Sequence, residues 1–265
     1  MKTVVLCLLA ALMLASCNYQ PKKIESDFKS YFDDFGVEGS MLIFDENANK
    51  YIVYNDTRCE TGYLPASTFK ILNSIIALET TVVRDTSQIL KWNGEEYGIP
   101  AWNRDQKLKH AFHVSCVPCY QEIARNIGLE RMKKYISETS YGKMDISSKN
   151  LDYFWLEGDS RITSYEQVNL LVRLKYNKLP FMERNQELVK EIMIVEENND
   201  YTLRAKTGWA TQDDVQIGWY VGYIENSKGT CYFALNIQKP EGDILFRKGR
   251  RGIAMNILEN LGYID

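Results

Sequence analysis

The stretch that decides the fold is Ser67-Thr68-Phe69-Lys70, which follows Tyr63-Leu64-Pro65-Ala66. After Pro65, apolar residues recur at helical spacing, which predicts a buried helix from Ser67 to Glu79. Side chains three residues apart share one face of a helix, so the Ser67 hydroxyl and the Lys70 amine lie together. At a helix N-terminus, backbone N–H groups favour negative charge that develops beside Ser67. The stretch therefore offers a candidate nucleophile.

A serine becomes a strong nucleophile only beside a base. The chain contains two histidines, His110 and His113, which leaves little choice for a histidine triad. A lysine serves instead when it is neutral. The same spacing also arises by chance, as a helix-capping serine and a solvated lysine. Alone, the motif leaves both interpretations open.

A second motif, Lys206-Thr207-Gly208, falls at the end of a predicted strand, Tyr201–Lys206. A glycine beside a strand lets another backbone approach closely. A substrate could then pair with the strand edge while Lys206 and Thr207 meet its carboxylate. The combination of Ser-x-x-Lys with a later Lys-Thr-Gly is typical of penicillin-recognising serine enzymes.

Three further motifs narrow the family. Ser115-Cys116-Val117 matches an S-x-V motif, and Trp155-Leu156-Glu157-Gly158 matches W-x-x-G. Tyr141-Gly142-Lys143 occupies the place of a Y-G-N triplet, with lysine where asparagine is usual. From about Phe28 to the C-terminus, the sequence resembles the class D, OXA-type, serine β-lactamases, which confer antibiotic resistance. The resemblance implies a hydrolase that opens β-lactams through an acyl-serine intermediate.

The resemblance also implies catalytic roles. Ser67 attacks the lactam carbonyl, and the backbone N–H groups of Ser67 and Trp209 form the oxyanion hole. Lys70 is the general base for acylation and deacylation, as an N-carboxylated lysine whose carbamate Trp155 hydrogen-bonds.

The proton relay and the anchoring of the substrate follow from the same resemblance. Ser115 relays a proton toward the leaving nitrogen, and Lys206 assists electrostatically. Thr207 and Gly208 bind the substrate at the strand. A guanidinium suits the substrate carboxylate because it can hold both oxygens. Register favours Arg247 for this role, with two alternatives left open, Arg250 and Arg251.

Other implied residues surround the site. Trp102 matches an aromatic residue that lines the site entrance in relatives, although a core position is equally consistent with the sequence. Phe69, Val117 and Leu156 are expected to keep the surroundings of Lys70 dry. Lys143 adds a cation near the site without an assigned role.

The carbamate on Lys70 requires a neutral amine. A free lysine has a pKa of about 10.4, and burial favours its neutral form. Carbon dioxide or bicarbonate is therefore the expected co-reactant, with no other cofactor and no metal.

The pattern of predicted elements indicates an α+β fold. Alternating stretches predict a hairpin at Ser40–Phe44 and Tyr51–Tyr54. The middle is mostly helical and the C-terminal third returns to strands, so we expect an antiparallel sheet flanked by helices, with an inserted helical lobe, as in transpeptidases. The other predicted helices are Tyr120–Asn126, Glu130–Glu138, Tyr165–Tyr176, Asn185–Ile194 and Arg250–Asn260, and the later strands are Gln216–Glu225 and Thr230–Gln238.

The N-terminus has the pattern of an export signal. The apolar run Val4–Leu14 is too short to span a membrane, and small residues lead into Cys17. This predicts a lipoprotein-type signal over residues 1–17, a polar mobile tether over 18–25 and one catalytic domain over 26–265. The expected location is the periplasm, with a lipid on Cys17 as the anchor.

Composition limits the partners. The chain has 265 residues and a formal net charge of −3 without long charged runs, which argues against nucleic-acid binding. Membrane contact is expected only through a lipid on Cys17, and β-lactams are the expected small-molecule partners. The sequence leaves monomer and homodimer open.

Other residues allow competing interpretations. Cys116-Val117-Pro118-Cys119 has the spacing of a thioredoxin-like redox pair but lacks the βαβ context, and pairing with Cys59 or Cys231 stays open. His110 and His113 lack the further ligands that a zinc site needs. A β-lactam sensor or a penicillin-binding protein would use the same Ser67 and Lys70 but would stay acylated.

Overall fold

The computed structural model describes residues 21–240 and 244–264. The predicted signal segment, with Cys17, and the first residues of the predicted tether lie outside the described residues. No helix in the described ranges is long and apolar enough to cross a membrane.

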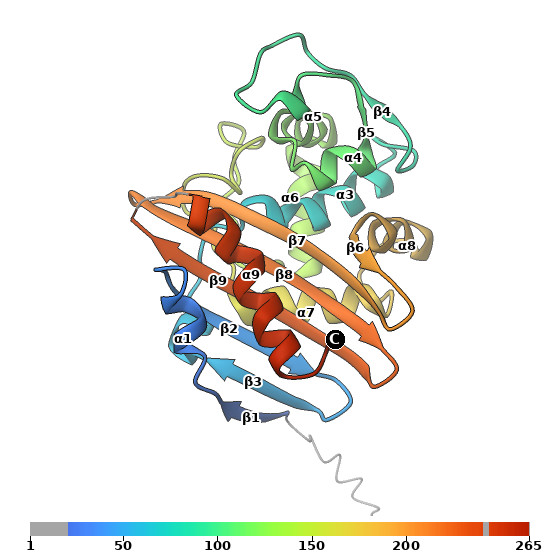
Figure 1. Ribbon diagram of the computed structural model, residues 1–265. Helices are drawn as coiled ribbons and strands as arrows, with labels where there is room; N and C mark the ends of the chain where they lie inside the picture. Colours follow the sequence, from blue (N-terminus) through green and yellow to red (C-terminus); the bar gives the residue numbers. More distant parts are fainter. Residues whose placement is uncertain (1–20, 241–243, 265) are drawn as a thin grey trace, which may run out of the picture.

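A seven-stranded sheet forms the centre of the molecule (Figure 1), with the order β1-β3-β2-β9-β8-β7-β6. Its long strands β8 and β9 are buried along most of their length, as expected for strands covered on both faces. All neighbours from β3 to β6 pair antiparallel. The strands are β1 (Lys22–Glu25), β2 (Glu38–Asp45), β3 (Lys50–Tyr54), β6 (Ile194–Glu197), β7 (Tyr201–Gln212), β8 (Val215–Asn226) and β9 (Gly229–Lys239).

The edge strand β1 corrects the prediction of a tether over residues 18–25. Lys22–Glu25 pairs in parallel with β3, so the sheet is mixed rather than wholly antiparallel. The exposed polar side chains of Lys22 and Lys23 suit an edge strand, which faces water and therefore lacks the apolar alternation that identifies inner strands.

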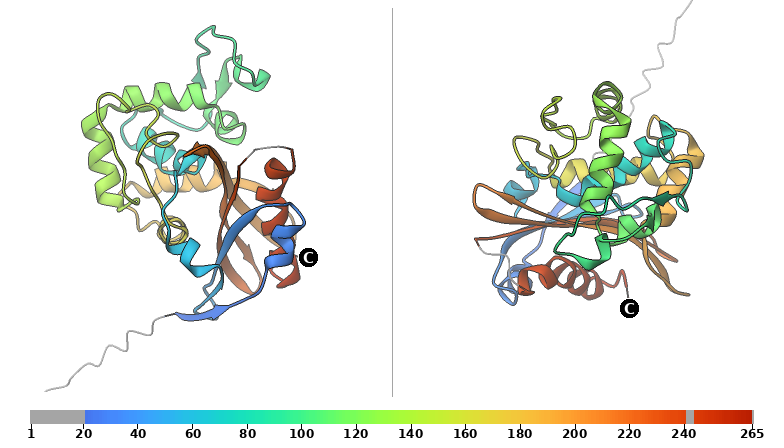
Figure 2. Two further views of the ribbon diagram at one scale, coloured as in Figure 1. Left: turned by 90° about the vertical axis from the view of Figure 1, so that its left-hand side faces the viewer. Right: turned by 90° about the horizontal axis from the view of Figure 1, so that it is seen from above.

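Two helices cover one face of the sheet, as the view from above shows (Figure 2). They are α1 (Lys29–Asp33) and α9 (Ile244–Asn260). Phe32 from α1 and a stripe of α9 that includes Phe246 and Ile253 pack with the sheet into one apolar core.

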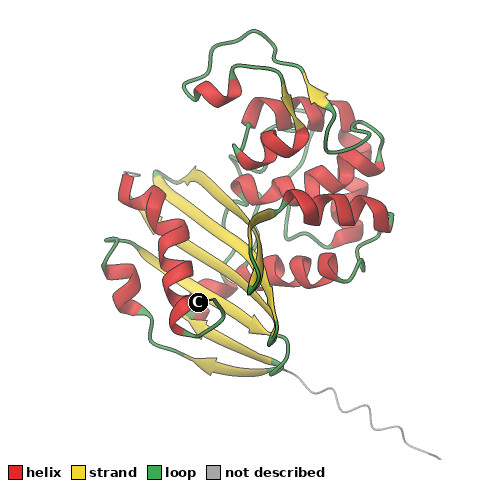
Figure 3. Cartoon of the chain, turned by 45° about the vertical axis from the view of Figure 1, so that its right-hand side comes forward, coloured by secondary structure: helices red, strands yellow, loops and turns green. Residues whose placement is uncertain are grey.

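The opposite face carries a second core and the predicted helical lobe (Figure 3). At the centre of the lobe lies α3, whose residues from Lys70 to Leu78 are all buried. A helix that is buried on every side requires a surrounding layer, which the other lobe helices supply. The remaining elements are α2 (Asp56–Glu60), the 3-10 turns η1 (Ala66–Phe69) and η2 (Pro100–Trp102), α3 (Lys70–Glu79), β4 (Ile89–Leu90), β5 (Gln106–Lys107), α4 (Leu108–His113), α5 (Val117–Ile127), α6 (Leu129–Thr139), α7 (Ser164–Lys175) and α8 (Glu183–Ile192).

Among the differences between predicted and observed boundaries, three concern the residues of the predicted site. Ser67 lies in η1 rather than at the start of an α-helix, because α3 begins only at Lys70. Lys206-Thr207-Gly208 lies inside β7, which continues to Gln212, and not at a strand end. The closing helix α9 begins at Ile244, ahead of Arg250. Tertiary packing explains why β7 and α9 are longer than predicted, because each element packs along its length on a neighbouring element.

Candidate active site

The η1 turn carries Ser67 and is held from two sides. Ala66, at φ 51°, donates its backbone N–H to the carbonyl oxygen of Trp155 at 2.8 Å. On the other side, a Cβ placed on Gly208 would lie 3.2 Å from Ala66 Cβ and from Pro65 O. The glycine of the strand motif thus lets the serine turn pack directly on β7, and Ser67 itself is 6% exposed.

Lys70 lies beside Ser67 in a dry setting. Its Nζ is 3.0 Å from Ser67 Oγ, and the side chain is fully buried. The neighbours are aromatic: Nζ lies 5.0 Å from the ring centre of Tyr120, and Phe69 stacks on Trp155 at 5.3 Å. Burial lowers the pKa of Lys70 to about 7, so its amine is half neutral near neutral pH. This is the environment that a lysine base requires.

Lys206 and Ser115, 91 positions apart in the sequence, form a second polar pair. Lys206 Nζ donates a hydrogen bond of 2.5 Å to Ser115 Oγ. Burial, and then the charges of Lys70 and Arg250, hold the pKa of Lys206 well below its usual range. A weakly basic amine bonded to a hydroxyl can pass a proton in either direction, as a relay requires.

Arg250, and not Arg247, faces the strand motif, which corrects the register-based prediction. Arg250 Nη1 donates to the carbonyl oxygen of Gly208 at 2.9 Å, and its guanidinium lies 5.1 Å from the ring centre of Trp209. Arg247 is exposed on α9. The physical reason is Gly218: a Cβ there would lie 2.9 Å from Arg250 Cγ, so the missing side chain opens the path that Arg250 takes across the sheet.

Arg250 can donate a further hydrogen bond in this position. Its Nε has no hydrogen-bond partner among the described residues, and burial lowers its pKa to about 10, with Arg247 as the second cause. Thr207, which directly precedes Gly208 in β7, is half-buried and carries a hydroxyl group. A charged donor in a partly buried place is suited to an anionic group of a ligand.

Two buried polar groups near Lys70 have no partner in the described part of the chain. They are the indole Nε1 of Trp155 and the side-chain amide of Asn73. An unpaired buried polar group is costly, so such groups usually await a ligand or water. Asn73 was not predicted from the sequence. The signal that could have identified it is a side-chain amide three residues after Lys70 in a mostly apolar helix.

The remaining predicted residues lie around this centre or away from it. Val117 starts α5 and Leu156 follows Trp155, both half-buried. Trp102 is also half-buried, and its Nε1 donates to the carbonyl oxygen of Val114 at 3.0 Å, so it is not a core residue. The side chain of Lys143 is exposed, and its backbone pairs with Arg161.

The structure resolves the cysteine and histidine alternatives. Cys116 and Cys119 form a disulfide, whereas Cys59 and Cys231 are free and buried. The disulfide spans the start of α5 in the helical lobe, outside any βαβ unit. Within residues 21–240 and 244–264, no three His, Cys, Asp or Glu side chains are grouped so that they could hold a metal ion.

Comparisons with known proteins agree with this geometry. A family profile described as the penicillin-binding protein transpeptidase domain matches residues 19–261. The OXA-48 β-lactamase of Klebsiella pneumoniae is 43% identical over 216 residues, which cover 82% of this chain and 81% of the relative. The chain belongs to the class D, OXA-type, β-lactamases.

Two kinds of solved structure are similar to this class D β-lactamase: another class D β-lactamase and the domain of a penicillin receptor. The class D β-lactamase YbXI from Nostoc is 41% identical with a TM-score of 0.86, and the match covers 90% of this chain and 99% of that one. The C-terminal domain of the penicillin receptor BlaR from Bacillus licheniformis is 30% identical with a TM-score of 0.86, over 92% of this chain and 98% of that domain. The transpeptidase-type fold is therefore confirmed.

Proposed function

We propose that this protein hydrolyses β-lactam antibiotics through an acyl-serine intermediate. The observation that carries the proposal is the fully buried Lys70 amine 3.0 Å from Ser67 Oγ. A base and a nucleophile within hydrogen-bond reach, in a dry site that lowers the pKa of the base, form an activated serine.

In acylation, Ser67 Oγ attacks the lactam carbonyl carbon and gives its proton to the base at Lys70. The C–N bond then breaks, and Ser115, bonded to Lys206, delivers a proton to the leaving nitrogen. The N–H groups of Ser67 and Trp209 stabilise the oxyanion. The close packing of Ala66 on Gly208 supports this role, because it brings the serine turn against β7. Water then hydrolyses the ester with Lys70 as the base again.

We also propose that Lys70 is N-carboxylated in the active enzyme. A carbamate would supply a carboxylate-type base with oxygens that accept hydrogen bonds. The residues present fit such a group: the Lys70 amine is neutral enough to react with carbon dioxide, and the Trp155 indole N–H lacks an acceptor among the described residues. Phe69 and Phe154, both fully buried, exclude water that would promote its loss.

The substrate carboxylate is assigned to Arg250 and Thr207. The guanidinium of Arg250 already reaches the β7 backbone at Gly208 and keeps its Nε free of partners in the described chain. This end of the site would hold the anionic group of the antibiotic while the lactam carbonyl lies at Ser67.

Hydrolysis of a chromogenic cephalosporin by the purified domain, with and without bicarbonate, tests the function. Sustained turnover that bicarbonate raises, and that Ser67→Ala and Lys70→Ala abolish, is expected. Mass spectrometry of the enzyme in bicarbonate reports the carbamate separately; an active enzyme with unmodified Lys70 would refute the carboxylation alone.

The similarity to the BlaR domain defines the alternative, a penicillin sensor. A sensor would give one stoichiometric burst and then a stable acyl-enzyme, so the deacylation rate separates the two functions. A stable acyl-enzyme in bicarbonate would overturn the proposal of hydrolysis.

Export and anchoring are part of the proposal. The short apolar segment before Cys17 supports secretion to the periplasm, and the small residues before the cysteine support lipid attachment there.

A further inference from the structure

Ser115 sits in an unusual backbone conformation between two helices. It separates α4 from α5, and its φ of 53° lies in the left-handed region that residues with side chains rarely adopt. Such a conformation persists only when the surrounding structure enforces it. What holds the residues on either side of Ser115 therefore decides where its Oγ lies.

The chain is fastened immediately before and immediately after Ser115. Before it, the carbonyl oxygen of Val114 accepts the hydrogen bond of 3.0 Å from Trp102 Nε1. After it, Cys116 is buried and disulfide-bonded to Cys119, one turn into α5.

The disulfide takes the place of an ordinary helix cap. Cys116 is the N-cap residue of α5, a position where serine, threonine, asparagine or aspartate is preferred. Its sulfur lies 3.3 Å from the Cys119 N–H, and sulfur is a weak acceptor. The covalent bond supplies the fixation that such a cap lacks.

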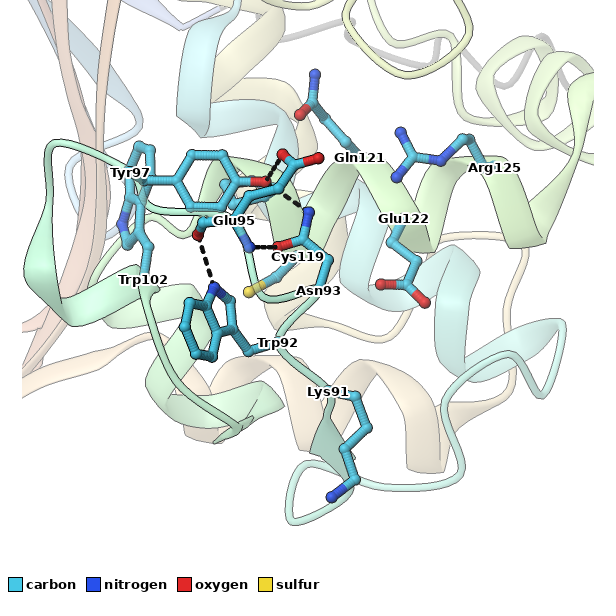
Figure 4. Close-up of a pocket in the computed structure, with 11 residues that line it drawn as sticks. Lys91, Trp92, Asn93, Glu95, Tyr97, Trp102, Cys119, Gln121, Glu122 and Arg125 are labelled. Carbon is cyan, nitrogen blue, oxygen red and sulfur yellow. Dashed lines mark hydrogen bonds between the residues drawn. The ribbon is translucent and has the colours of Figure 1, made fainter.

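The second cysteine is itself anchored. Gln106, 4% exposed, lies with its Nε2 3.5 Å from Cys119 Sγ, and its Oε1 lies 3.2 Å from His110 Nδ1. Cys119 also lines a pocket that includes Trp102 (Figure 4), so the two groups that hold the Ser115 segment border the same pocket.

Global stabilisation is a weak explanation for this cross-link. In the chain-entropy account a disulfide stabilises more when it closes a longer loop, and this one joins residues only three positions apart. Its effect is local.

We propose that the Cys116–Cys119 disulfide is a positioning element that holds Ser115 Oγ against Lys206 Nζ for proton delivery in acylation. The inference rests on the proposed function, in that Ser115 is taken as the proton relay. A displacement of about 1 Å at such a group can lower a rate on the order of 100-fold.

A double-mutant cycle on acylation tests the proposal. The rate of acylation of Ser67 by a fluorescent penicillin is measured per active site in the wild type, Cys119→Ser, Ser115→Ala and the double variant. We expect Cys119→Ser to slow acylation about 10- to 100-fold in the wild type but less than about twofold in the Ser115→Ala background. Equal acylation rates in wild type and Cys119→Ser, or additive effects, would overturn it.

Reduction of the wild type gives a second measurement that does not depend on how the variant folds. A water-soluble phosphine takes up an oxygen from water and becomes the phosphine oxide, while the disulfide accepts the two electrons and the two protons of that water and becomes two thiols. Cys119 lines the pocket in Figure 4, through which the phosphine can approach. The reduced wild type should acylate as slowly as Cys119→Ser, which should not respond to the phosphine. An unchanged rate after confirmed reduction contradicts the inference.

The outcome is separable from that of the proposed function. Acylation is read whether or not the acyl-enzyme turns over, so a sensor-like protein would fail the hydrolysis test and could still pass this cycle.

Discussion

At the scale of single residues, the site depends on two lysines that the fold keeps away from water. Lys70 and Lys206 are both buried, and burial is the first cause of the lowered pKa of each. Each amine is held without a carboxylate partner among the described hydrogen bonds and ion pairs. Catalytic competence is therefore obtained at the expense of stability.

Replacement of Lys70 by methionine should stabilise the protein and abolish activity. The pKa of this amine falls from 10.5 in the unfolded chain to about 7 when folded. Between about pH 7 and 10.5 the unfolded state therefore binds more protons, so the cost of the buried amine is largest at and below pH 7 and disappears as pH rises toward 10.5. At pH 7 we expect Lys70→Met to raise the free energy of unfolding by about 2–4 kcal/mol, measured in urea.

The pH dependence provides the control for that prediction. The advantage of Lys70→Met should shrink as pH rises from 7 toward 10.5, because above 10.5 the wild-type amine is neutral in both the folded and the unfolded state. For the same reason, acylation by the wild type without bicarbonate should rise with pH and level off above about 7. A pH-independent difference in stability would contradict the assignment.

The two arginines of α9 offer a matched pair. Arg250 contacts Gly208 O and is partly buried, whereas Arg247 is exposed. Loss of a charge-assisted bond costs about 1.5–3 kcal/mol, so Arg250→Ala should raise KM for a carboxylate-bearing β-lactam about 10- to 100-fold. Arg247→Ala should leave KM within about twofold. Steady-state kinetics of both variants decide between the two arginines. A larger increase in KM for Arg247→Ala than for Arg250→Ala would support the sequence-based assignment of the carboxylate to Arg247.

At the scale of elements, the site depends on the contact between the serine turn and strand β7. A Cβ on Gly208 would meet Ala66 and Pro65 of the serine turn and Trp219, its partner residue on β8. Ala66 also bonds Trp155 O, so the turn that carries Ser67 is held between the sheet and the segment with the Trp155 indole.

Substitution of Gly208 by alanine should separate these elements. The new Cβ would lie 3.2 Å from three neighbouring atoms, one in η1 and one in Pro65 directly before it, and overpacking of this kind costs about 1–3 kcal/mol. We expect a lower melting temperature and slower acylation. Gly98→Ala is the control, because nothing lies within 4 Å of a Cβ at that exposed position. Equal behaviour of the two variants would exclude a packing role for Gly208.

At the scale of the whole molecule, two cores on opposite faces of one sheet bring the site together. The helical lobe contributes Ser67, Lys70 and Ser115, while strand β7 and helix α9 contribute Lys206 and Arg250. The site therefore lies where the lobe meets the sheet, and neither part contains it alone.

The anchor proposed at Cys17 is also a property of the whole protein. A lipid would keep the protein in the membrane fraction of cells, so Cys17→Ala should move it to the soluble periplasmic fraction, read by immunoblotting. The rate of hydrolysis by the purified domain should not change, because Cys17 lies outside the catalytic domain. Equal fractionation of both proteins would refute lipid attachment.

The sequence by itself determined the family and pointed to the candidate reacting groups. Ser-x-x-Lys, S-x-V and Lys-Thr-Gly are local patterns that state a residue type and a spacing, and the structure brings Ser67, Lys70, Ser115 and Lys206 together as predicted. The longer helices and the central strands were also predicted, since their apolar periodicity is local, whereas the short helices α1, α2 and α4 were not.

Only the tertiary structure decided the rest. Arg250 rather than Arg247 reaches the strand because Gly218 leaves a path, which depends on how α9 packs on the sheet. The strand at Lys22–Glu25 and the unpaired Trp155 indole likewise depend on neighbours distant in sequence. The pairing of Cys116 with Cys119 is local in sequence, but the cysteine spacing alone did not choose it over pairing with Cys59 or Cys231. Burial and contact are properties of the packed chain, and no short pattern of residues encodes them.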